Sequence, residues 1–150
     1  MVAAAGHADA RVRLAAVTLL GSLNTPASLD TLRAQLVSTD LVVASAAAAA
    51  LAKLGDRTQL TTMRQLGAKV ALHPELAGEV AGALAALDAK EAVADLRTWF
   101  GVPDRATRQA AAAALTRLTG EAVQAPHVEA PKRAGAALLP PPAGTTLRVT

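Results

Sequence analysis

Large apolar residues recur along the chain at a nearly constant separation, with polar residues at recurring positions between them. One series, with steps of 31, 33 and 31 residues, holds Leu20, Leu51, Leu84 and Leu115. A second series with the same steps holds Leu23, Leu54, Leu87 and Leu118. Two shorter series fall between them and hold Leu29, Leu60 and Val93, and Leu32, Met63 and Leu96. A period of this length is typical of repeat proteins, and two apolar segments in each period predict a pair of helices.

Residues that begin and end helices divide the chain in the same way. Thr25-Pro26 is typical of an N-cap followed by proline at the first helical position, and Asp9, Asp40, Asp56 and Asp104 are each placed to cap a helix. Gly55, Gly101 and Gly120 are placed to end helices. Seven helices are predicted at 9–23, 26–38, 40–54, 58–72, 74–87, 89–101 and 104–119. Their short connections make neighbouring helices antiparallel, so the predicted fold is an all-α solenoid of helix pairs over residues 9–120.

Composition supports helices and excludes several classes of protein. Hydrophobic residues make up 52% of the chain, but it has one Trp, one Phe and no Tyr, which disfavours a sheet-based core. The absence of cysteine excludes disulfides and thiolate zinc sites. The longest run of low charge, residues 41–52, is shorter than the roughly 20 residues that span a bilayer. No signal peptide is evident at the N-terminus, so a cytoplasmic location is the default expectation.

The second helix of each predicted pair carries a recognisable motif. Asp9-x-x-Val12-Arg13, followed by alanines and a spaced pair of leucines, resembles the second helix of a HEAT repeat, particularly of the bacterial PBS-lyase-like type. The other copies match less well: they hold Asp104, Thr107 and Arg108; Asp40, Val43 and Ala44; and His73, Leu76 and Ala77. The resemblance implies that these Asp and Arg residues link neighbouring repeats. The missing Arg and Asp in the middle copies then predict an interrupted series of links.

The two ends of the predicted solenoid differ. The last helix presents Arg105, Arg108, Gln109 and Thr116 on one face, as expected of a terminal repeat whose outer side meets water. The first helix is apolar nearly all round, and residues 1–8 form an N-terminal stub too short to cover it. We therefore expect either a segment of a larger protein or self-association through this helix.

Residues 121–150 have a different composition, rich in proline and alanine. Three Pro-containing stretches, ending with Pro140-Pro141-Pro142, disfavour helix and predict a disordered tail or linker. We expect this tail to add nothing to the fold from Glu121 onward, and trypsin to cleave first at Lys132 or Arg133.

Candidate chemistry is sparse. His7, His73 and His127 lie far apart in the sequence, and no metal-binding or nucleophile motif is present, so no catalytic, metal or cofactor site is predicted. The single aromatic cluster, Trp99-Phe100, is expected to pack in the core between repeats.

The exposed face of the second helices is the most informative surface. Its positions hold mainly small residues, above all on the helix at 74–87, where the predicted partner-binding residues are Glu75, Gly78, Glu79 and Gly82. Small side chains allow another helix or an extended peptide to approach the backbone closely. We therefore expect a protein or peptide partner on this face, which lines the concave side of such solenoids.

The predicted function is a noncatalytic protein-interaction scaffold. A regulatory or accessory module fused to an enzyme domain is an alternative, as is a lyase-type accessory protein acting on a protein-bound chromophore, which the resemblance implies. Nucleic-acid binding is a minor alternative, because 15 basic residues exceed 12 acidic ones only slightly.

Overall fold

A computed structural model describes residues 2–127. The eight α-helices in this range are α1 (Val2–Ala5), α2 (Ala10–Leu20), α3 (Pro26–Gln35), α4 (Leu41–Lys53), α5 (Leu60–Val70), α6 (Pro74–Ala86), α7 (Val93–Thr98) and α8 (Arg105–Thr119). Two short 3₁₀ turns, η1 (Lys90–Ala92) and η2 (Trp99–Gly101), flank α7. The described range contains no strand, and the predicted all-α solenoid is confirmed.

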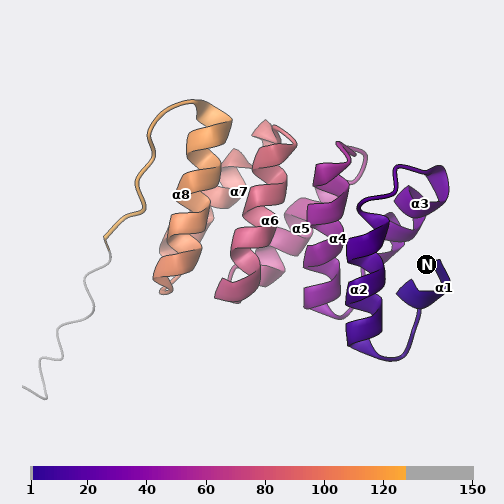
Figure 1. Ribbon diagram of the computed structural model, residues 1–150. Coiled ribbons are helices and arrows are strands. Elements are labelled where there is room, and N and C mark those ends of the chain that lie inside the picture. Colours follow the sequence, from indigo (N-terminus) through magenta and orange to yellow (C-terminus); the bar gives the residue numbers. More distant parts are fainter. Residues whose placement is uncertain (1, 128–150) are drawn as a thin grey trace, which may run out of the picture.

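The helices lie in two layers (Figure 1). The front layer consists of α2, α4, α6 and α8, which stand side by side in chain order. The rear layer consists of α3, α5 and α7, while α1 lies beside α2 at the N-terminal end. Successive front helices pack extensively against each other, whereas successive rear helices make few mutual contacts. The connections between layers are short, as predicted.

The buried residues follow the repeat period. Every member of the first leucine series is buried, as are Leu32, Met63 and Leu96 of the rear helices. The second leucine series is uneven, because Leu87 and Leu118 are buried but Leu23 is exposed at the end of α2. Trp99 is buried and its ring lies beside Gly67 of α5, so the predicted core role of Trp99 agrees with the structure.

Front helices approach closely because their facing residues are small. In α4, the alanines at positions 44, 47 and 48 are completely buried between neighbouring helices. At Gly21, a Cβ atom would lie only 2.8 Å from the Cβ of Ala50, so any side chain there would push α2 away from α4. The alanine-rich sequence therefore sets the spacing of the front layer.

The helix boundaries agree with most of the predicted caps. Asp9, Asp40 and Asp104 accept hydrogen bonds from first-turn backbone N–H groups, and Thr25 forms a capping box with Ser28. Asp56 does not cap a helix: its carboxylate accepts hydrogen bonds from Thr58, and α5 begins only at Leu60. The predicted helix at 89–101 is divided, because only its middle six residues are α-helical.

The N-terminal segment, which was expected to be a short stub, begins with a helix of one turn. Residues Val2–Ala5 form α1, which packs on α2 and α3 and buries Ala5. The expectation that nothing covers the second face of the first long helix is therefore wrong for part of that face. Leu19 and Leu23 of this end remain largely exposed.

The segment that follows α8 also contributes to the fold, contrary to prediction. After Gly120 ends α8 with a left-handed φ of 75°, the chain turns back along the helix. The backbone N–H of Val123 donates to the hydroxyl of Thr116 at 3.0 Å, and that hydroxyl donates to the carbonyl of Ala112 at 2.9 Å. The composition did not reveal this contact because it uses backbone groups. The predicted disordered tail otherwise concerns residues 128–150, which lie outside the described part of the chain.

Candidate functional site

The predicted partner-binding residues lie together on α6. Glu75, Gly78, Glu79 and Gly82 are all exposed, and their spacing of three and four residues places them on one stripe of the helix. A Cβ atom built on Gly78 or Gly82 would have no neighbour within 4 Å. The stripe is therefore an open, low surface with room for another chain.

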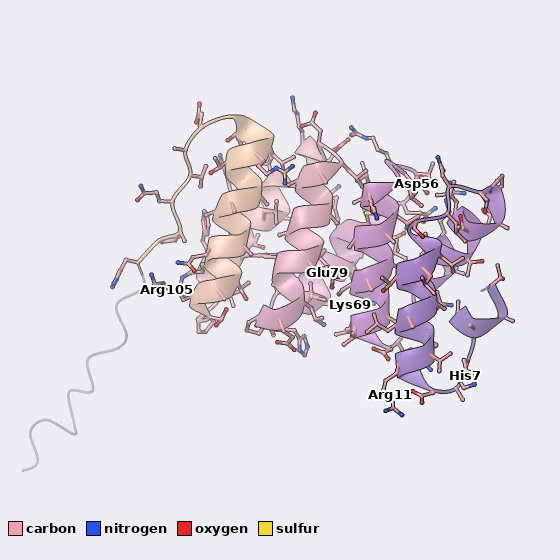
Figure 2. The ribbon with its side chains drawn as sticks, viewed as in Figure 1. His7, Arg11, Asp56, Lys69, Glu79 and Arg105 are labelled. Atoms are coloured by element: carbon pink, nitrogen blue, oxygen red, sulfur yellow. The ribbon has the colours of Figure 1, made fainter. Side chains whose placement is uncertain are left out.

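A shallow depression of about 200 Å³ lies next to this stripe on the front layer. Its lining comes from three successive front helices and consists of Thr18, Gly21, Ala46, Ala49, Ala50, Lys53 and Glu79. Figure 2 shows Glu79 at the junction between α6 and α4. The depression owes its existence to small residues, because side chains larger than alanine at positions 21, 46 or 49 would fill it.

The depression carries one charge of each sign. Burial raises the pKa of Glu79, although the residue as a whole is exposed. Lys53, the last residue of α4, also lines the depression. Sequence reasoning placed Glu79 and the second helices on this face but missed Lys53.

One expected surface residue is buried. Ser45 occupies the same repeat position as the exposed Gly78, yet Ser45 is completely buried in α4. Its hydroxyl oxygen has no hydrogen-bond partner among residues 2–127. The same repeat position is therefore buried on α4 and exposed on α6.

The motif arginine of the first repeat links neighbouring repeats. Arg13 Nη2 lies 3.1 Å from Asp40 Oδ2, and Arg13 Nη1 donates to the carbonyls of His7 and Ala8, each at 2.8 Å. Arg13 forms no ion pair with Asp9, although the two residues are four positions apart. Asp9 instead pairs with Arg11 at 3.2 Å and caps α2.

The series of links is interrupted between α4 and α6. Ala44 replaces the arginine of the motif and His73 replaces the aspartate, and no ion pair within residues 2–127 joins these two helices. His73 Nδ1 is near its own neighbour Glu75, at 3.9 Å. The front layer therefore relies on packing alone at this junction.

Two further ion pairs, which sequence reasoning missed, join the rear layer. Arg33 Nε donates to Asp56 at 2.7 Å, and Arg64 Nε donates to Asp95 at 2.5 Å. Burial alone would raise the pKa of Asp56, but its hydrogen bonds from Arg33 and Thr58 outweigh burial and hold it below the usual range. A signal was present, because Arg33 and Arg64 occupy the same repeat position, 31 residues apart.

Arg108 differs from its prediction. It was expected on the solvent-exposed face of the last helix with Arg105 and Gln109, but only 5% of its surface is exposed. Its Nη1 donates to the carbonyls of Val102 and Pro103, just as Arg13 reaches back to the chain before α2. Asp104, four residues earlier, caps α8 through the backbone N–H of Thr107. Arg105 and Gln109 are exposed as expected.

The structure offers no metal centre in its described part. Among residues 2–127, no group of three or more His, Asp or Glu side chains could hold a metal ion. His7, His73 and His127 are all exposed and lie in different parts of the chain. Within the same range, no helix is both long enough and apolar enough to cross a membrane.

Comparison with known protein families agrees with the repeat architecture. Residues 1–71, which include α1 to α5, match the family model for HEAT repeats. This part of the chain is therefore similar to the HEAT-repeat family. HEAT repeats generally mediate protein–protein interactions and are typically noncatalytic scaffolds. The PBS-lyase-like subtype stays a prediction. Neither the curated proteins nor the solved structures gave a match.

Proposed function

We propose that this chain is a noncatalytic interaction scaffold that binds a helix or an extended peptide of a protein partner on its front layer. The observation that carries the proposal is the depression across α2, α4 and α6, continuous with the open glycine stripe of α6 through Glu79. The match of residues 1–71 to the family model for HEAT repeats supports a protein partner.

The packing of the two layers supports the choice of face. Front helices contact each other more extensively than rear helices do. A solenoid whose units are closer on one side curves toward that side, so this difference favours the front layer as the concave surface. Concave surfaces of repeat proteins are extended and suit elongated partners.

The chemistry of the face favours close packing over charge. Its lining is mainly Ala, Gly and Thr, with Lys53 and Glu79 as charges of opposite sign. Glu75 adds a second acidic group to the stripe. A surface of this kind attracts neither phosphate groups nor a strongly charged partner. Complex formation should therefore depend weakly on salt, whereas a phosphate-contacting protein loses affinity by orders of magnitude.

A pull-down from a lysate of the source cells tests the proposal. The bait is the full chain, compared with Gly82→Leu, which adds bulk to the open stripe without meeting any neighbouring atom. The matched control is Ala68→Leu, which adds the same bulk at an exposed position of α5 in the rear layer. Both variants should fold, because leucine is a good helix former.

We expect a partner retained by the unsubstituted chain and by Ala68→Leu, in low and moderately high salt, and lost with Gly82→Leu. Equal retention by all three baits would place the binding site elsewhere. A steep loss with rising salt, reversed by nuclease treatment, would support nucleic-acid binding instead.

A further inference from the structure

Arg108 is an almost completely buried cation that forms no ion pair in the described chain, although the carboxylate of Asp104 lies near enough to interact with its charge. Arg13, Arg33 and Arg64 each donate to an aspartate of a following repeat, at 3.1, 2.7 and 2.5 Å. No carboxylate among residues 2–127 forms an ion pair with Arg108, although only 5% of this residue is exposed. Buried charges in proteins are normally paired, because desolvation of an unpaired charge is costly.

The Nε side of the Arg108 guanidinium, which has no hydrogen-bond partner in the described chain, has the geometry that suits a carboxylate. Its Nη1 is used by the carbonyls of Val102 and Pro103, while its Nε has no hydrogen-bond partner within residues 2–127. In a planar guanidinium, the N–H groups of Nε and Nη2 point to the same side and match the two oxygens of a carboxylate. Arg33 and Arg64 use Nε to bind aspartate elsewhere in this protein.

Arg108 lines a cavity of about 240 Å³ at the beginning of α8. The other lining residues are Arg105, Gln109, Ala125, Pro126 and His127. Figure 2 shows Arg105 at the lower end of α8, near the segment that returns from its upper end. Two guanidinium groups and an amide thus face a site with no acidic lining residue in the described chain.

The helix end adds to the attraction for an anion. The N-terminus of a helix of 15 residues carries a partial positive charge from its aligned peptide dipoles. The nearby carboxylate of Asp104 is held in the helix cap, where the hydrogen bond from the Thr107 N–H is the main cause of its lowered pKa. Asp104 therefore satisfies the first-turn backbone and leaves the Nε edge of Arg108 unpaired.

We propose that this cavity binds the carboxylate of an acidic side chain in a protein partner. The site lies at the C-terminal end of the solenoid and is distinct from the front-layer depression. A carboxylate is favoured over other anions because the protein repeats the same Arg–carboxylate contact between its own repeats. Ala125 and Pro126 provide an apolar wall, and the amide of Gln109 can bond to a peptide backbone.

Nuclear magnetic resonance on the full chain tests this site through the arginine Nε–H signals. The probe is the acetylated and amidated peptide Ala-Asp-Glu-Asp-Ala, and its control is the uncharged counterpart Ala-Asn-Gln-Asn-Ala. We expect a saturable shift of the Arg108 Nε–H signal with the acidic peptide and none with the uncharged one.

Matched substitutions separate the site from general charge attraction. Arg108→Lys keeps the charge but loses the planar fork, and should weaken peptide binding by about tenfold or more. Arg117→Lys, at an exposed position of the same helix, should leave binding unchanged. If Arg108→Lys fails to fold, Arg105→Gln at the exposed rim should still weaken binding severalfold.

Four results would overturn the proposal. Equal shifts with the uncharged peptide would show that the carboxylate is not recognised, and equal weakening by Arg117→Lys would indicate general charge attraction. Tighter binding of inorganic phosphate than of the acidic peptide would assign the cavity to a phosphate ligand. Higher peptide affinity of Glu129→Gln would show that the chain's own carboxylate competes for the site, in place of a partner's.

Discussion

The front helices contact one another mainly through alanine, glycine and buried leucine, with a single arginine–aspartate pair between Arg13 of α2 and Asp40 at the start of α4. The rear layer has less direct packing and two arginine–aspartate pairs. Between α2 and α4, the approach is so close that Gly21 has no room for a Cβ atom beside Ala50. Behind them, Arg33 and Arg64 extend to the following repeat to reach Asp56 and Asp95. Direct contact among the rear helices is correspondingly limited.

This difference shows how residue size controls the architecture of a solenoid. Small residues allow the helices of the front layer to pack closely, so the stability of this layer comes from burial of apolar surface. The helices of the other layer make fewer direct contacts, and the long side chains of Arg33 and Arg64 reach from one repeat to the next. The same small residues leave the front surface low and open, which is why we assign the partner to that layer.

The largest expected effect comes from weakening the packed layer. Leu51→Ala removes a completely buried side chain of α4 and should lower the free energy of unfolding by about 2–5 kcal/mol, because a cavity forms in a tightly packed core. Urea denaturation followed by circular dichroism measures the change. The control, Leu19→Ala at an exposed position of α2, should cost far less. Equal losses would mean that packing is not concentrated between the layers.

The next effect comes from the rear-layer ion pairs. Asp56→Ala removes a carboxylate whose side chain is only 5% exposed and leaves Arg33 without its Nε partner. Loss of charge-assisted hydrogen bonds at this degree of burial should lower the free energy of unfolding by about 1–3 kcal/mol. Asp30→Ala removes the other, exposed partner of Arg33 and should have a smaller effect in the same urea experiment. A larger loss for Asp30→Ala would contradict this assignment.

The same ion pair should make stability depend on acid pH. The folded protein holds the pKa of Asp56 below its unfolded value of about 3.9, so the ionised carboxylate stabilises the fold above that pH. This stabilisation is lost as pH falls through the folded pKa. Calorimetric melting between pH 6 and pH 3 should show a shallower decline for Asp56→Ala than for the unsubstituted chain. Parallel declines would show that Asp56 does not contribute.

The smallest effect is expected at the exposed rear-layer pair of Arg57 and Glu91. Their charged atoms are 3.9 Å apart and both side chains are about half exposed. Arg57→Ala should therefore change the free energy of unfolding by no more than about 0.5 kcal/mol, because solvent screens such pairs. A loss approaching that of Asp56→Ala in urea denaturation would mean that exposed pairs also hold the rear layer together.

The periodic part of the fold could be predicted because the repeats impose their spacing on the sequence. Leu20, Leu51, Leu84 and Leu115 are all buried, and the aspartate caps mark three helix starts correctly. The short helix α1 could not be predicted, because a segment of four residues is too short to show a helical pattern of apolar and polar positions. The docking of residues 121–127 could not be predicted from composition either, since its hydrogen bond joins the backbone N–H of Val123 to the Thr116 hydroxyl.

The surface chemistry was harder to predict than the core. Glu79 and the open glycines were identified from their helical position, but the equivalent position on α4 holds the buried Ser45. Helical spacing placed Arg108 on the same face as Arg105, yet its long side chain turns back toward the carbonyls that precede α8. The repeat position determines where the backbone of a residue lies, whereas the surrounding residues determine where a long, flexible side chain points.

Site-specific photo-crosslinking tests most directly the claim that the front layer receives the partner. A benzoylphenylalanine introduced at Gly82 of α6 is compared with one at Ala68 of α5, since both positions are exposed and hold small residues. Irradiation in a lysate of the source cells should yield a discrete adduct from position 82 but not from position 68, and an excess of unlabelled chain should suppress it. An adduct from position 68 alone would place the partner on the rear layer and contradict the account.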